Sequence, residues 1–358
     1  MKIKKLTPGF FRENVIYLLL LLFISLFYLM PGSFDSFTET MPAVEGGDLI
    51  EAQTNFPSEE GLKKLFTEGN IYAIGLYGIG ILLILGFIAG IGMDLVFIIF
   101  KLRGGEVIPR SSIMPEAGWQ VIDVVRVIIL YLFFSCLISY VFFVSRFTFV
   151  VESLVVKVAE LDELSRMALS LSISYLLILS LLIYFIVIKY KQKMRVLGLN
   201  VRNFFKNVFL GAAGYIAFIP LLILAAYVSF LLASFFNIGP EENPLLNVFQ
   251  IEGRPALLVY FVVCICLLGP VVEEIFFRGF LYKALKKSFG VLPAVVVSSV
   301  FFAWLHMTFI GFLPIMVLGL LLAYLYEKNG TLIPSITIHI IHNSVIVISV
   351  MIFKGLGS

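Results

Sequence analysis

Long apolar stretches, separated by shorter polar segments, run along almost the whole chain and predict helices that cross a membrane. A spanning helix needs about 20 mainly apolar residues. Nine stretches come close to this length or exceed it, and 312–326 is the shortest of them. They are 14–31, 70–100, 124–145, 168–188, 207–236, 257–281, 291–309, 312–326 and 331–353. The expected fold class is therefore all-α, a polytopic bundle of eight to nine transmembrane helices.

Composition supports a membrane protein and excludes an ordinary soluble domain. Hydrophobic residues make up 60% of the 358 residues and charged residues 14%. Soluble domains are nearer half apolar and about a quarter charged. The lipid bilayer is therefore an expected partner. No nucleic-acid partner is expected, because topology and anionic lipid account for the basic segments.

The distribution of Lys and Arg predicts which segments face the cytoplasm, since basic loops stay inside. The segment 189–206 has six basic residues and no acid, and 278–288 has four basic residues and no acid. The segment 31–69 instead carries eight acidic residues against two lysines. We therefore expect an integral multi-pass membrane protein with a cytoplasmic N-terminus and an external loop over 31–69.

The candidate chemistry is confined to the second half of the chain. Residues 1–195 contain about four expected helices and no histidine, and their role is open. Within them, the spacing Gly86-x-x-x-Gly90 predicts the close approach of another helix. We treat 1–195 as an N-terminal transmembrane region and 196–358 as the region that carries the site.

Two adjacent carboxylates and an arginine lie inside an apolar run. Charged residues are costly in a bilayer and are usually functional there. Glu274 and Arg278 are four residues apart and share a helix face, whereas Glu273 lies about 100° further round. One carboxylate can thus be neutralised while the other stays available, although both could pair with neighbouring helices. Pro270 lacks an amide proton and predicts a helix kink about one turn before Glu273.

All three histidines fall in the last 53 residues of the chain. His306 lies in an apolar run and could be either catalytic or a structural hydrogen-bonding residue. His339 and Asn343 share a helix face, so their donors can converge on one oxygen atom. His342 lies about 60° to one side of His339, and a structural role is the favoured interpretation for it.

These residues carry a resemblance to a known family. Three spaced motifs occur in order, Glu273-Glu274-x-x-x-Arg278, Phe302-x-x-x-His306 and His339-x-x-x-Asn343. Together they resemble the signature of the CPBP family, which comprises CAAX prenyl proteases and bacteriocin-processing or immunity (Abi-type) membrane proteins. The match is clear over about 270–345, and the text around the motifs is similar to that of bacterial members, which implies a bacterial cell membrane.

The resemblance implies an intramembrane glutamic endopeptidase that acts on a membrane-associated peptide or protein. By the family's pattern, Glu273 and His306 activate a water molecule, while His339 and Asn343 form an oxyanion hole. Glu274 and Arg278 support the site. No cofactor or metal is implied. The chemistry is reasonable, because burial suits a carboxylate to act as a general base and preorganised donors stabilise an oxyanion.

Three alternatives remain open from the sequence. Glu273, His306 and His339 or His342 could instead ligate Zn²⁺ beside a water, as in zinc-dependent peptidases. No H-E-x-x-H helix supports that alternative. The chain could also be a non-enzymatic scaffold or bacteriocin-immunity protein, or a proton-coupled transporter.

Overall fold

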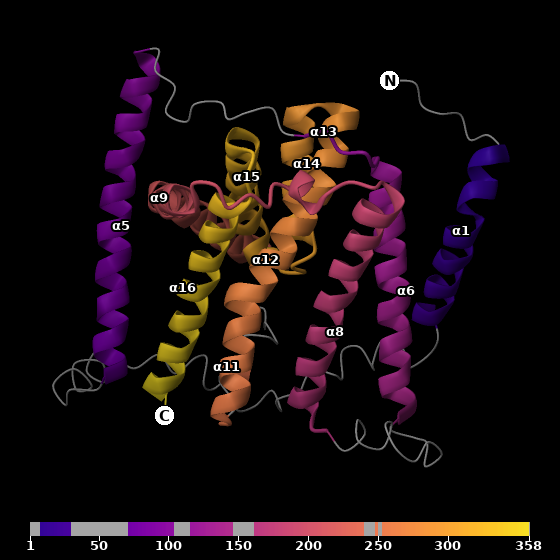
Figure 1. Ribbon diagram of the computed structural model, residues 1–358. Helices are drawn as coiled ribbons and strands as arrows, with labels where there is room; N and C mark the ends of the chain where they lie inside the picture. The colour runs from indigo at the N-terminus through magenta and orange to yellow at the C-terminus, as the bar shows by residue number, and fades with distance from the viewer. Residues whose placement is uncertain are drawn as a thin grey trace. The chain divides into compact units, whose positions relative to one another are not determined.

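The structure, a computed structural model, describes residues 8–29, 71–103, 115–145, 161–239, 248–249 and 253–357, in which every regular element is a helix (Figure 1). Seven of these helices are long and apolar enough to cross a membrane, and two shorter apolar helices cover 14–26 and 291–304. The expected polytopic helical fold is confirmed. The acidic segment 31–69 lies outside the described residues, so its external position stays a prediction.

The chain divides into two compact units that interleave along the sequence. The first comprises 1–43 and 121–190, and the second comprises 44–120 and 191–358. The helices of the first unit are α1 (Pro8–Leu29), α6 (Val121–Ser145), α8 (Glu163–Ile183) and the π-helical η1 (Tyr184–Lys189). Within this unit, α6 packs against both α1 and α8.

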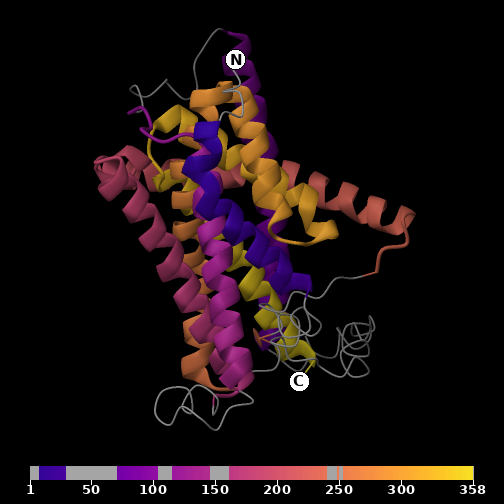
Figure 2. The ribbon, with the colours of Figure 1, turned by 90° about the vertical axis from the view of Figure 1, so that its right-hand side faces the viewer.

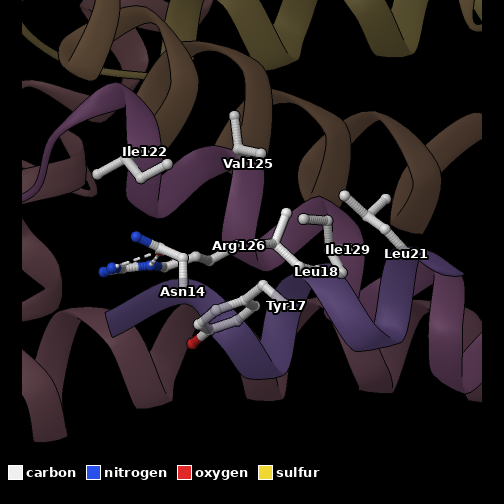
Figure 3. A pocket seen from close by; sticks show the side chains of 8 residues that line it. All are labelled: Asn14, Tyr17, Leu18, Leu21, Ile122, Val125, Arg126 and Ile129. Atoms are coloured by element: carbon white, nitrogen blue, oxygen red, sulfur yellow. Dashed lines mark hydrogen bonds between the residues drawn. The ribbon is translucent and has the colours of Figure 1, made fainter. Parts of the chain in front are cut away.

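A network of hydrogen bonds and ion pairs connects the helices of the first unit. Arg126 of α6 donates to Asn14 Oδ1 of α1 from Nη2 at 2.8 Å and from Nε at 3.0 Å. Its Nη1 lies 3.1 Å from the buried Asp123, which also accepts from Lys189 Nζ at 2.6 Å. Figure 3 shows the guanidinium directed at Asn14, beside a small cavity of about 100 Å³ lined mainly by aliphatic side chains. Arg126 and Asp123 of α6 therefore connect this helix to α1 and to η1.

The core of the second unit lies where α9 (Phe204–Phe235) packs against α15 (Phe309–Asn329) and α16 (Ile333–Gly357). The buried residues of this core are Tyr215, Ile219, Leu222, Leu318, Leu322, Leu325 and Ile338. In Figure 1, α9 is seen nearly end-on while α16 runs lengthwise, so the two helices cross steeply. The same α9 extends sideways in the turned view of Figure 2.

Helix α5 (Ile71–Leu102) belongs to this second unit and packs closely on α9. A Cβ added at Gly90 would lie 2.6 Å from the Ile216 carbonyl oxygen and from Pro220 Cδ. One added at Gly86 would lie 2.8 Å from Ile219 Cδ1. Any larger side chain would push the helices apart, so the close approach predicted from the glycine spacing is confirmed.

One continuous helical rod carries the first motif. It is built from α11 (Pro255–Val263), the π-helical η3 (Cys264–Leu268), α12 (Gly269–Glu274), the π-helical η4 (Ile275–Tyr282) and α13 (Lys283–Phe289). It is followed by α14 (Val291–Trp304), which packs against α13 and α15.

The lengths of α14 and α15 differ from the sequence expectation. The run 291–309 was expected to be a full span and 312–326 a short one, but α14 ends at Trp304 and α15 has 21 residues. The chain turns at Met307, whose φ is 52°, and the Thr308 side chain then accepts from Gly311 N to start α15. His306 therefore lies just beyond the end of a helix rather than inside one.

Candidate active site

The helical rod is widened by a π turn immediately before the two carboxylates. Gly269 N–H donates to the Cys264 carbonyl, five residues back. In the same register the donor for the Ile265 carbonyl would be residue 270, which is a proline without an N–H. Asn343 Nδ2 of α16 fills this position and donates to Ile265 O at 2.9 Å. Beside Pro270 the helix therefore contains a π turn over Cys264–Leu268. A hydrogen bond from Asn343 of the third motif satisfies one carbonyl group of this turn.

The second carboxylate of the pair is fully buried and ion-paired. Arg278 Nη1 lies 2.6 Å from Glu274 Oε1, and the two side chains are 1% and 0% exposed. Arg278 also donates from Nη2 to the Gly319 carbonyl at 3.3 Å, and its guanidinium lies 4.4 Å from the Phe302 ring centroid. The pairing expected from the four-residue spacing is present, and Arg278 also contacts backbone and an aromatic ring, while its Nε has no hydrogen-bond partner among the described residues.

His339 lies between the two carboxylates. Its Nδ1 is 3.1 Å from Glu274 Oε1, and its Nε2 is 3.8 Å from Glu273 Oε2. Glu273 is 32% exposed in its side chain, whereas Glu274 is wholly buried. Among the described residues, neither Glu273 Oε2 nor Glu274 Oε2 has a hydrogen-bond partner. The two acids therefore differ in environment as the helix faces suggested, and Glu273 is the one whose side chain is partly exposed.

The second motif meets the others through a phenylalanine. His306 Nδ1 is 2.8 Å from the Phe302 carbonyl oxygen, and the His306 ring lies edge-on to the Phe302 ring at 4.8 Å between centroids. The buried Phe302 ring also lies 5.5 Å from the His339 ring. Over the described residues, no hydrogen bond joins His306 to Glu273. His306 is exposed, and the Phe302 ring connects it to His339 and Arg278.

Phe302 is a central packing position to which the sequence pattern gives no role of its own. It touches His306, His339 and the Arg278 guanidinium, so all three motifs pack on one side chain. The signal available in the sequence was its position one turn before His306.

His342 faces a different neighbour from His339. Its Nδ1 lies 3.4 Å from the Tyr215 hydroxyl of α9, with the two rings edge-on at 6.1 Å. Because Tyr215 belongs to the core, this contact agrees with the structural interpretation of His342. No group of three or more His, Cys, Asp or Glu side chains able to hold a metal ion occurs in the described part of the chain.

Comparison with known proteins finds similarity over part of the second half of the chain. Residues 255–345 match the family model described as type II CAAX prenyl endopeptidase Rce1-like. A Bacillus subtilis (strain 168) protein named "Putative membrane peptidase YdiL" is 29% identical over 114 residues, which are 32% of this chain and 45% of the relative. The matched part thus spans about half the relative's length. No solved structure matches. The region with both carboxylates, the arginine and the three histidines is therefore similar to the Rce1-like type II CAAX prenyl endopeptidases.

Proposed function

We propose that this protein is an intramembrane endopeptidase of glutamic type, which hydrolyses a peptide bond of a membrane-associated peptide or protein. The observation that carries the proposal is His339 set between a partly exposed carboxylate, Glu273, and an ion-paired one, Glu274. Ionisable groups gathered among apolar helices are costly and are kept mainly where they do chemistry. The family match over 255–345 supports the same reaction class.

In this proposal Glu273 is the general base. Its Oε2 has no hydrogen-bond partner among the described residues, so it is free to accept a proton from water. Glu274 is wholly buried, and its Oε1 already contacts Arg278 at 2.6 Å and His339 at 3.1 Å. It therefore orients the histidine rather than the water. A well-placed general base contributes about 10²–10⁴-fold to a rate.

His306 is proposed to share the water with Glu273. A carbonyl oxygen can only accept a hydrogen bond, so the contact with Phe302 O places the proton of the neutral imidazole on Nδ1. Nε2 then carries the lone pair and can accept a proton. Because no hydrogen bond joins His306 to Glu273 among the described residues, the water itself is the proposed link between them.

His339 and Asn343 are proposed to stabilise the oxyanion. His339 Nδ1 donates to the Glu274 carboxylate, so Nε2 can donate only when the ring carries both protons. The proposal therefore requires the imidazolium form, beside two carboxylates. Asn343 uses one N–H for Ile265 O and keeps the second for the oxyanion. Each such donor lowers a barrier by about 2.7–4 kcal/mol.

The cellular setting is also a proposal. The resemblance of the text around the motifs to bacterial members favours a bacterial inner membrane, and the distribution of basic segments favours an N-terminus in the cytoplasm. The substrate would enter from the bilayer. The family description names CAAX prenyl endopeptidases, so a prenylated C-terminal peptide is the first substrate to try, beside non-lipidated membrane peptides.

The test is to reconstitute the purified protein with a library of membrane peptides and to identify new termini by mass spectrometry. We expect products that disappear with Glu273→Gln. The matched control is Asp94→Asn, the same carboxylate-to-amide change in the apolar helix α5. Products that persist in Glu273→Gln, or that are absent from the wild type, would contradict the proposal.

A further inference from the structure

The segment 115–120 lies outside the family match. It runs alongside the helical rod that carries the first motif. Its alternate residues face opposite ways. Ala117 and Trp119 are buried, while Glu116 and Gly118 are exposed. Such alternation is typical of an extended segment that contacts a neighbour along one side. We call residues 115–120 the strap.

The odd-numbered residues of the strap contact the helical rod. Trp119 Nε1 donates to the Phe280 carbonyl at 2.9 Å, and the two rings stack at 5.0 Å between centroids. Further along the rod, Lys283 Nζ donates to the Pro115 carbonyl at 3.0 Å, and Lys287 Nζ donates to the Ala117 carbonyl at 2.8 Å.

The three rod positions 280, 283 and 287 are spaced by three and four residues and so share one helix face. The strap therefore lies along that face at three points.

The even-numbered residues are held from the other side. Gln192 Oε1 accepts from Gly118 N at 2.8 Å, and Gln192 Nε2 donates to the Glu116 carbonyl at 3.2 Å. The strap is thus fixed on both sides, and Trp119 is fully buried between its neighbours. The strap is therefore tied to the rod and to Gln192 at several separate points.

The strap contacts the same part of the rod that carries Arg278, the cation of the buried ion pair. Phe280 is two residues after Arg278, within the same π-helical η4. A π turn has one more residue than an α turn, so a small change in its register rotates every side chain that it carries. Arg278 would then move relative to Glu274, and Glu274 relative to His339.

We propose that Trp119 is a positioning residue for the active site. Its indole N–H holds the Phe280 carbonyl, and through the register of η4 it sets the Arg278–Glu274 pair and the ring of His339. This inference rests on the proposed function for its effect on a rate, but its effect on geometry can be measured without any substrate. Trp119→Phe removes the N–H donor and keeps an aromatic ring for stacking on Phe280.

The first experiment uses the full-length protein labelled with ¹⁵N-histidine, since the chain has only three histidines and all lie near the site. We expect Trp119→Phe to shift or broaden the His339 ring signals. Lys287→Met should change the same signals in the same direction, because it loosens the strap at an independent point. Glu116→Gln is the matched control, since the strap uses only the Glu116 backbone, and it should leave the spectrum unchanged.

The second experiment measures cleavage by the same variants. Losing one hydrogen bond that aligns the site should lower kcat by about threefold to tenfold and leave KM within about twofold. Unchanged His339 signals in both strap variants, with only lower thermal stability, would show that the strap merely stabilises the fold. If the wild type cleaves nothing, the proposed function fails, while the histidine spectra still decide the role of Trp119.

Discussion

The Glu274–Arg278 pair allows a stability prediction whose size follows from its surroundings. Removing one member of a buried pair costs about 3–5 kcal/mol, because the other charge is left uncompensated. After Arg278→Met, Glu274 still has His339 at 3.1 Å, so we expect a loss near the lower end, about 3 kcal/mol. After Glu274→Gln, the Arg278 charge has lost its paired carboxylate and keeps the Gly319 carbonyl and the Phe302 and Phe277 rings, so we expect about 4 kcal/mol.

The double variant separates charge from packing. With both charges gone and volumes nearly kept, we expect a smaller loss than in either single variant, below about 3 kcal/mol, so the coupling free energy should exceed about 4 kcal/mol. Reversible unfolding by SDS in mixed micelles, followed by circular dichroism, measures all four proteins. Lys286→Met is the control, since its pair with Glu327 is 33% and 16% exposed and should contribute only about 0–1 kcal/mol. Additive losses in the double variant would refute this reasoning.

Further outcomes are expected from activity measurements. Glu273→Gln should lower the cleavage rate by about 10²–10⁴-fold without loss of stability, and His306→Ala should do the same if it shares the water. Asn343→Ala should lower the rate by about 10²–10³-fold and also destabilise the fold, because it removes a donor from Ile265 O. His342→Ala should change the rate by less than about threefold, since a partly buried contact with Tyr215 accounts for its ring. Activity should survive EDTA and 1,10-phenanthroline, and recovery by added Zn²⁺ after loss would instead support a metallopeptidase.

The sequence predicted most of the helices well, because a long apolar stretch is by itself a strong signal for a membrane-spanning helix. It also predicted the Glu274–Arg278 pair, since four-residue spacing is a local property of a helix. It did not predict the break after Trp304, which depends on a left-handed residue at Met307 and a cap at Thr308.

Contacts between distant segments were the part that the sequence could not supply. Nothing local in Phe302 indicates that its ring meets two histidines and an arginine. In the same way, the partner of Trp119 lies 161 residues away, and the family match does not reach the strap. Such contacts depend on how helices dock, which hydrophobic periodicity does not specify. The catalytic roles of Glu273, His306, His339 and Asn343 stay proposals.

The bond between Asn343 and the Ile265 carbonyl also bears on the order in which the protein can assemble. While the rod 255–289 lies alone in lipid, the proline leaves that carbonyl short of a helical donor, and an unsatisfied polar group there costs several kcal/mol. The donor is on α16, 78 residues later in the chain. The rod can therefore reach its final hydrogen bonding only after the last described helix has entered the membrane. A nascent chain that stops before residue 343 would hold both carboxylates in place and still lack a finished site.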